Sequence, residues 1–290
     1  MFHGSLVALV TPFKKGKVDE KALGDLIEWQ IAQGTHGLVP CGTTGESATL
    51  THEEHDRVIA FTINAAKGRV PVIAGTGSNS TDEAIALTKH AKKAGADGAL
   101  MITPYYNKPT QEGLYRHYKA VADAVDLPIV LYNIPGRTSV NMLPATVARL
   151  ASIKTIVAIK EGSGSLQQVS DILQACGDRM TVLAGDDALA LPMMALGGKG
   201  VITVTANIVP KNMAEMVDAF AVGKLKDAQK LHFKMSPLFA ALFYETNPIP
   251  VKEALGMMGK CSSEVRLPLC PMAADTKEKL SRALKDYGLI

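Results

Sequence analysis

Eight short apolar segments, each followed by a longer segment with helical character, restrict what this chain can fold into more than any other feature. The apolar segments lack polar alternation, as expected when both faces of a parallel sheet are covered. As strands we predict Leu6–Val10, Gly37–Cys41, Val70–Ala74, Ala99–Thr103, Pro128–Tyr132, Ile156–Lys160, Met180–Ala184 and Val201–Val204. Eight units of strand and helix predict an α/β fold, a (β/α)8 or TIM barrel.

The segments between these strands carry helix signals. Ser80 or Thr81 before two acidic residues is a typical helix start, and Gly95 after two lysines is a typical stop. Predicted helices include Glu20–Gln33, Glu53–Ala66, Thr81–Ala94, Glu112–Val125 and Gln167–Cys176. The competing fold, a doubly wound sheet, lacks its glycine motif, because Gly75-Thr76-Gly77 is followed by Ser-Asn-Ser.

No strand is predicted from Lys224 onward. Helices are expected over Lys224–Glu245, Val251–Met258 and Thr276–Tyr287, divided by proline-containing breaks at Asn247–Pro250 and Leu267-Pro268. We therefore predict a barrel with the active site over residues 1–223 and a helical appendix packed on it over residues 224–290.

The composition narrows the class of protein. Hydrophobic residues make up 47% of the chain and charged residues 20%, which suits a soluble globular protein with a sizeable core. A net charge of +3, with the charges interleaved, gives no reason to expect nucleic acid or a membrane surface as a partner. We expect neither a membrane span nor secretion, and the scattered cysteines suit reduced thiols in a cytoplasmic enzyme.

Lys160 ends the apolar segment Ile156–Lys160. A buried strand seldom carries an ammonium, because its dehydration costs roughly several kcal/mol unless the group is paired or neutral. Desolvation favours the neutral amine, a nucleophile that can form a Schiff base with a carbonyl. The alternative is a lysine that has passed the strand end and holds its charge in water.

Other strand ends carry groups that would complement such an amine. The loop after the second strand contains Thr43 and Thr44, Tyr106 follows the fourth strand, and Tyr132 and Arg137 follow the fifth. Active sites of these barrels lie where the strands end. A Schiff-base enzyme needs an amine that attacks a ketone, a phenol that moves protons, a hydroxyl that positions the phenol and a guanidinium that binds a carboxylate.

Three motifs carry a resemblance to a known family. They are Gly42-Thr43-Thr44-Gly45-Glu46, Tyr132-Asn133-Ile134-Pro135-Gly136-Arg137-Thr138 and Ala158-Ile159-Lys160-Glu161. In this order they resemble the motifs of the 4-hydroxy-tetrahydrodipicolinate synthases, long called dihydrodipicolinate synthases. The resemblance covers essentially the whole chain. This family is part of a wider group of class I, pyruvate-using aldolases and lyases that share the barrel and the lysine of the sixth strand.

The resemblance implies roles for four catalytic residues. Lys160 would form the imine with pyruvate, and Tyr132 would be the proton-handling phenol above it. The Thr43 hydroxyl would link Tyr132 to Tyr106, which in this family reaches across a dimer interface into the neighbouring site. The assembly usual for the family is a homotetramer made of two dimers.

The resemblance also implies the substrates and the residues that bind them. Thr44 would bind the carboxylate of pyruvate and Arg137 that of L-aspartate 4-semialdehyde, while Gly185 and Ile202 match pocket-lining positions. The implied reaction gives 4-hydroxy-tetrahydrodipicolinate, in the first committed step of lysine biosynthesis through diaminopimelate. It needs no cofactor and no metal.

His52 and His55, three positions apart, could present two ligands to a metal ion. No third ligand lies at a telling distance, so we predict no metal site; two exposed histidines in a first helical turn are the simplest alternative. The resemblance suggests L-lysine as an inhibitor instead. Family members inhibited by lysine bind it at the dimer interface with residues that match Ser47, Ala48, His52, His55, Asn79, Glu83 and Tyr105.

Two rival functions are weighed against the synthase. A sibling enzyme, such as an N-acetylneuraminate lyase or a 2-keto-3-deoxy sugar acid aldolase, would keep Lys160 and Tyr132 but would not need Arg137. A pyruvate-binding regulator that has lost catalysis would not need the whole set of amine, phenol, hydroxyl and guanidinium. Arg137 therefore favours the synthase over the first rival, and the complete set argues against the second.

Overall fold

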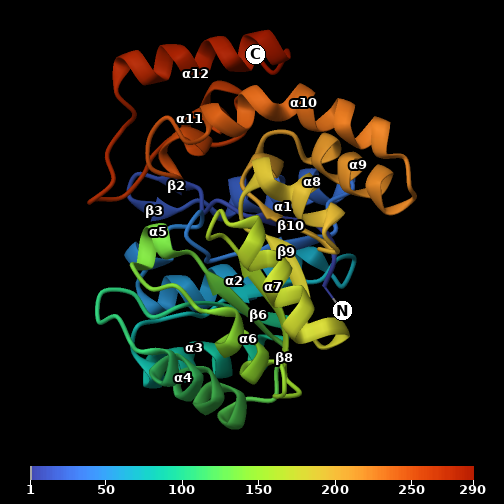
Figure 1. Ribbon diagram of the computed structural model, residues 1–290. Coiled ribbons are helices and arrows are strands. Elements are labelled where there is room, and N and C mark those ends of the chain that lie inside the picture. The colour runs from blue at the N-terminus through green and yellow to red at the C-terminus, as the bar shows by residue number, and fades with distance from the viewer. Residues whose placement is uncertain (1) are drawn as a thin grey trace.

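Eight parallel strands enclose a single interior in the computed structural model, which describes residues 2–290 (Figure 1). The hydrogen-bonded order is β4-β1-β10-β9-β8-β7-β6-β5, and a bridge between Leu38 and Val72 joins β4 to the segment before β5. The strands are β1 (Gly4–Ala8), β4 (Gly37–Val39), β5 (Ile73–Gly75), β6 (Gly98–Ile102), β7 (Ile129–Asn133), β8 (Ile156–Glu161), β9 (Thr181–Ala184) and β10 (Gly200–Thr203). The predicted barrel is confirmed.

Helices follow the strands and cover the outside of the barrel. They are α1 (Glu20–Ala32), α2 (His52–Ala66), α3 (Thr81–Ala94), α4 (Gln111–Ala124), α5 (Pro135–Thr138), α6 (Pro144–Leu150), α7 (Leu166–Cys176), α8 (Ala190–Ala195) and α9 (Pro210–Ala221). The predicted ends of α3 are confirmed. The Ser80 side chain caps the helix by accepting from the Glu83 amide, and Gly95 closes it in the left-handed conformation at φ +93°. A short hairpin of β2 (Phe13–Lys14) and β3 (Lys17–Val18) was not predicted.

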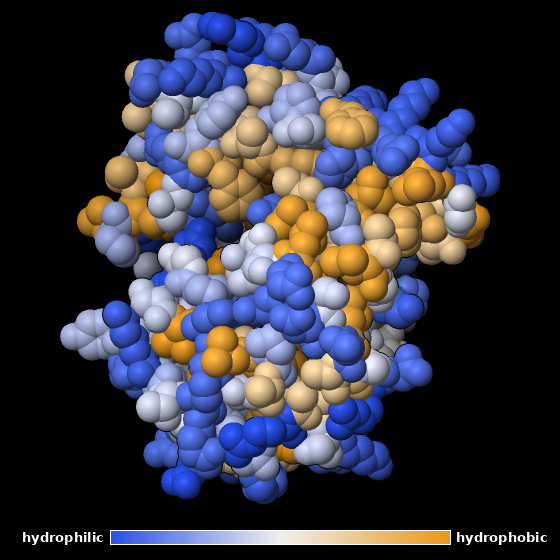
Figure 2. All heavy atoms as spheres, viewed as in Figure 1, coloured by the Kyte–Doolittle hydropathy of each residue, from blue (hydrophilic) through white to orange (hydrophobic). Residues whose placement is uncertain are grey.

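The C-terminal helices α10 (Leu225–Ala241), α11 (Ile249–Met257) and α12 (Ala274–Tyr287) lie together on one side of the barrel, with α12 outermost (Figure 1). The three predicted helices are confirmed, although α10 ends at Ala241 rather than at Glu245. On the face drawn in Figure 2, hydrophobic residues gather beneath these helices, where the surface is hollowed, and hydrophilic residues cover most of the rest. None of the helices in the described part of the chain has both the length and the apolar character of a membrane span.

The barrel interior is filled by inward-facing side chains. Small and branched residues dominate, and Tyr132 is the aromatic member of the set, which comprises Leu6, Ala8, Val39, Ile73, Leu100, Val130, Tyr132, Ala158, Leu183 and Ile202. The interior is therefore a packed core and not a channel. A substrate can reach only the end of this core, where the strands pass into their following loops.

Candidate active site

Lys160 lies inside the barrel mouth. It is 5% exposed, and its backbone pairs with that of Tyr132 on the neighbouring strand β7. Its Nζ lies 4.3 Å from the centre of the Tyr132 ring. The alternative of a lysine that has passed the strand end into water is therefore wrong. A buried amine beside a phenol is the pair that imine chemistry requires.

Lys160 lines a small cavity of about 40 Å³. Six predicted catalytic and substrate-binding residues line it: Thr43, Thr44, Tyr132, Arg137, Lys160 and Gly185. Ile202 does not line it, because this side chain is fully buried in the interior core beneath, and Val204 lines the cavity instead. The structure thus brings together side chains from the ends of four strands and their loops.

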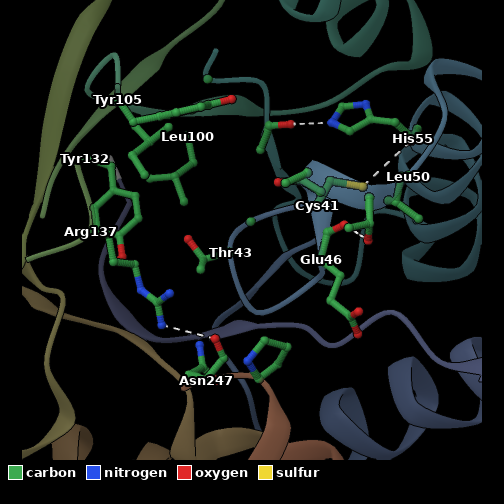
Figure 3. A pocket seen from close by; sticks show the side chains of 18 of the residues that line it. Cys41, Thr43, Glu46, Leu50, His55, Leu100, Tyr105, Tyr132, Arg137 and Asn247 are labelled. Atoms are coloured by element: carbon green, nitrogen blue, oxygen red, sulfur yellow. Dashed lines mark hydrogen bonds between the residues drawn. The ribbon is translucent and has the colours of Figure 1, made fainter. Parts of the chain in front are cut away.

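A larger cavity of about 500 Å³ opens beside the first, and Thr43, Tyr132 and Arg137 line both. Figure 3 shows Thr43 between Tyr132 and Arg137 on one side and Cys41 and Glu46 on the other. Six of the seven residues predicted to bind lysine line this larger cavity: Ser47, Ala48, His52, His55, Glu83 and Tyr105. The seventh, Asn79, lies just outside it and donates from Nδ2 to the Tyr105 carbonyl at 3.2 Å.

The loop after β4 forms a tight turn that leaves donors free. The Gly45 amide donates to the Gly42 carbonyl at 3.0 Å and the Glu46 amide to the Thr43 carbonyl at 3.1 Å. Within residues 2–290 no acceptor is present for the amides of Thr43 and Thr44. Free backbone N–H groups beside a cavity suit a carboxylate or an oxyanion.

Close packing holds this loop against β5. A Cβ atom on Gly75 would lie 2.1 Å from the Cys41 carbonyl oxygen, so only glycine allows the approach. Cys41 and Glu46 both adopt left-handed backbone conformations, with φ of +55° and +53°. Such conformations are costly for residues with a side chain and persist where the surroundings enforce them.

Arg137 and Thr44 are joined by a residue that the sequence did not point to. Arg137 is exposed at the cavity mouth, and its Nη2 donates to the Asn247 carbonyl at 3.1 Å (Figure 3). The Asn247 Nδ2 in turn donates to Thr44 Oγ1 at 3.0 Å, and Asn247 lines both cavities. We interpreted Asn247 only as part of a break between helices, since an asparagine before a proline carries no signal specific to a site.

The two histidines differ, which corrects the alternative that both are exposed. His52 is exposed, with Nε2 3.3 Å from Glu83 Oε1. His55 is buried, with Nε2 2.9 Å from the Gly75 carbonyl oxygen, and burial lowers the pKa of His55. No group of three or more histidine, cysteine, aspartate or glutamate side chains in residues 2–290 could hold a metal ion. Burial also raises the pKa of Cys41, which makes its thiol a poor nucleophile.

Tyr106 does not reach the site of its own chain. It is 90% exposed, has a φ of +72° and lines neither cavity. Its neighbour Tyr105 points into the larger cavity, where burial and the Glu83 carboxylate raise the pKa of Tyr105. A single chain therefore holds three of the four predicted catalytic residues at its cavity.

The fold and the site define a class of protein. A closed barrel that buries a lysine amine beside a tyrosine ring, with a guanidinium and free backbone amides at the same cavity, is the arrangement of a class I aldolase-type lyase, which binds its keto substrate as a Schiff base.

Comparison with known proteins narrows this class. The model of the dihydrodipicolinate synthetase family matches residues 1–287. The chain is 63% identical over 290 residues to the 4-hydroxy-tetrahydrodipicolinate synthase of Thermodesulfovibrio yellowstonii, covering 100% of both. The chain belongs to the dihydrodipicolinate synthetase family.

Solved structures that resemble this chain are also dihydrodipicolinate synthases. Dihydrodipicolinate synthase from Aquifex aeolicus is 52% identical, with 99% of each chain covered and a TM-score of 0.98. The enzyme from Cyanidioschyzon merolae, solved with lysine bound, is 42% identical, with a TM-score of 0.97 and coverage of 100% of this chain and 99% of that one. A monomeric dihydrodipicolinate synthase variant is 44% identical, with a TM-score of 0.97 and coverage of 100% and 98%.

Proposed function

We propose that the barrel mouth joins pyruvate to L-aspartate 4-semialdehyde through a Schiff base on Lys160 and gives 4-hydroxy-tetrahydrodipicolinate. The observation that carries this proposal is the buried Lys160 amine 4.3 Å from the Tyr132 ring, in a chain 63% identical throughout to a synthase of this name. The reaction is the first committed step of lysine biosynthesis through diaminopimelate. We place it in the cytoplasm, with the site on a barrel of residues 1–223 and an appendix of residues 224–290.

The chemistry follows from the positions of the groups. The Lys160 amine attacks the ketone carbon of pyruvate, and loss of water leaves the imine. The Tyr132 phenol moves the protons of this step and of the removal of a methyl proton that gives the enamine. The enamine carbon then bonds to the aldehyde carbon of the second substrate. Attack of the substrate's own amine on the imine carbon closes the ring and releases Lys160.

The carboxylates of the two substrates would bind to two different groups of residues. The free amides of Thr43 and Thr44 and the Thr44 hydroxyl lie at the inner cavity, where the carboxylate of pyruvate would bind. Arg137 lies at the mouth, where an incoming semialdehyde would meet its guanidinium. A guanidinium offers two parallel hydrogen bonds to a carboxylate, which fixes the direction of the substrate as well as its affinity.

Replacement of Arg137 tests the choice of the second substrate. We expect Arg137→Ala to lower kcat/KM for aspartate semialdehyde by about 10- to 100-fold, because a charge-assisted hydrogen bond contributes roughly 1.5–3 kcal/mol. Imine formation with pyruvate should be unchanged. Arg137→Lys keeps the positive charge but lacks the planar guanidinium. Its kcat/KM for aspartate semialdehyde should lie between that of Arg137→Ala and that of the unmodified enzyme. An unchanged kcat/KM in Arg137→Ala would favour a sibling aldolase, which parallel assays with sialic acid and deoxy sugar acids would detect.

We further propose that L-lysine binds in the outer part of the larger cavity and inhibits the enzyme. The supporting observations are the six predicted residues that line this cavity and the relative solved with lysine bound. The Glu83 carboxylate, close to His52, would accept hydrogen bonds from the side-chain ammonium of the inhibitor. The Asn79 side-chain amide would donate to the inhibitor's carboxylate. Tyr105 adjoins Tyr106 in sequence, which offers a route from this site to the proton relay.

The Glu83 carboxylate gives a sharp test of lysine binding. We expect Glu83→Ala to abolish inhibition while turnover without lysine is retained, since the variant removes only the acceptor for the inhibitor's amine. Asp82→Ala, at the exposed neighbouring carboxylate, is the matched control and should leave inhibition intact. Inhibition of the unmodified enzyme should be partial and not competitive with pyruvate. Calorimetry without a lysine signal at millimolar concentration would rule the site out and leave the catalytic assignment standing.

A further inference from the structure

A buried ion pair connects the C-terminal helices to the loop that carries Thr43 and Thr44. Lys252 of α11 places Nζ 2.6 Å from Oε1 of Glu46, the last residue of that loop. The two side chains are 0% and 1% exposed, and the residues are 206 positions apart in the sequence. Neither group takes part in the proposed reaction, and Lys252 lines neither cavity.

Each partner has further contacts that hold it in place. The Lys252 Nζ also donates to the Thr11 carbonyl at 3.0 Å and lies 4.1 Å from the centre of the Phe13 ring. The Glu46 Oε2 accepts from the Arg266 amide at 3.1 Å. The Thr11 hydroxyl donates to the Gly45 carbonyl at 2.7 Å. The contacts of Glu46 with Arg266 and of Gly45 with Thr11 hold the end of the loop, one and two residues after Thr44, and those of Lys252 hold its ammonium beside Glu46.

Stability alone does not explain such a pair. Removing two charges from water costs so much that an apolar pair of similar volume is often as stable or more so. What the pair does provide is a defined geometry, because Glu46 is held at φ +53°, a conformation that a residue with a side chain rarely adopts. The turn that ends at Glu46 is the same turn that leaves the amides of Thr43 and Thr44 free beside the cavity.

A second contact from the same C-terminal segment points to the same loop. Asn247, five positions before Lys252, donates to the Thr44 hydroxyl at 3.0 Å. The segment from Asn247 to Lys252 therefore contacts the loop at two places: the hydroxyl of Thr44, a residue that lines the small cavity, and the Glu46 carboxylate at the end of the turn.

We propose that Lys252 is a positioning residue for this reaction. Through Glu46 it fixes the turn that directs the amides and hydroxyls of Thr43 and Thr44 to the carboxylate of pyruvate. It acts from the C-terminal helices and touches no substrate. This inference rests on the function proposed above for the two threonines.

Single and double variants separate positioning from stability. Lys252→Met removes the ammonium at similar volume and leaves a buried carboxylate, so both the melting temperature and kcat/KM for pyruvate should fall, the latter at least tenfold. Adding Glu46→Gln removes the unpaired charge while an oxygen remains for the Arg266 amide. The double variant should recover much of the melting temperature, but kcat/KM for pyruvate should stay at least tenfold low because the turn is no longer fixed.

The pair between Lys277 and Glu253 is a matched control. It joins α12 to the same helix α11 at 2.6 Å but does not contact the loop. Lys277→Met should leave kcat and KM for both substrates unchanged.

The outcomes distinguish this inference from the proposed function. If the double variant folds and its kcat/KM for pyruvate equals that of the enzyme without substitutions, the positioning role is overturned. The ion pair would then contribute to the structure alone. If the double variant does not fold, Glu46→Gln alone tests the same step. It keeps the shape of the side chain but removes the charge and leaves one acceptor oxygen for the two donors, Lys252 Nζ and the Arg266 amide. Normal kinetics in this variant would overturn the inference as well. An unmodified enzyme that failed to convert aspartate semialdehyde would instead contradict the proposed function.

Discussion

Borohydride added together with pyruvate is expected to attach a three-carbon unit permanently to Lys160. Hydride reduces the C=N bond of the imine to a stable amine, so the adduct survives digestion and shifts the mass of the peptide that contains Lys160. We expect Lys160→Ala to lose both the adduct and turnover, with kcat lower by at least about 1,000-fold, or roughly 4 kcal/mol in the barrier. Lys160→Arg, which keeps a long basic side chain but cannot form the imine, should be equally inactive.

The chain contains its own control for this experiment. Lys252 is as buried as Lys160, but its ammonium is paired with Glu46 and faces neither cavity. It should remain unmodified in the same digest. Inactivated protein with an unmodified Lys160 would exclude the Schiff-base mechanism for this site.

The strands were predictable because both faces of each are covered. A continuous apolar segment is the signature of that environment, and the helix starts and stops between the strands come from capping residues such as Ser80 and Gly95. The β2–β3 hairpin and α5 were not predictable in this way. Strands of two residues and a helix of four span only about one period of a hydrophobic pattern, so the pattern cannot repeat within them.

That the candidate catalytic residues Thr43, Tyr132 and Lys160 lie close together was predictable for a topological reason. Parallel strands in a closed barrel all end at one mouth, so residues far apart in sequence must meet there. The burial of His55 was missed, although its helix buries His55, Val58, Ile59 and Thr62 on one face, a spacing of three and four residues that the sequence does show. A position in the first turn of a helix suggests exposure, but burial depends on which face of the helix the residue occupies. His55 lies on the buried face of α2.

The contacts of Asn247 and Lys252 with the loop could not be predicted from local sequence patterns. Their contacts with the loop join residues more than 200 positions apart, and no motif in either segment reports the other. Lys252 does carry one local signal, although a weaker one than that of Lys160: Lys252 and Glu253 are the two charged residues in the otherwise apolar helix α11. Such a signal says that a charge is buried, but only the surroundings decide whether it attacks a substrate or pairs with a carboxylate.

Tyr106→Phe is expected to lower kcat strongly while the fold remains intact, because only a hydroxyl is lost from a side chain that is 90% exposed. Loss of one proton-transfer group typically costs about 100- to 10,000-fold. We propose that Tyr106 acts in the site of a partner chain, within a dimer of dimers, since it lines neither cavity of its own chain. Tyr244→Phe, at another exposed tyrosine outside both cavities, should leave kcat unchanged.

Mixing two inactive variants tests whether the site is shared. In a dimer of one Tyr106→Phe chain and one Lys160→Ala chain, one site would combine Lys160 of the first chain with Tyr106 of the second. After complete exchange of equal amounts, about a quarter of all sites should be complete, so activity should recover to about a quarter of that of the unmodified enzyme. If Tyr106 served its own chain, no site in the mixed dimer would be complete. Native mass spectrometry that shows mixed dimers without any recovery of activity would therefore rule out a shared site.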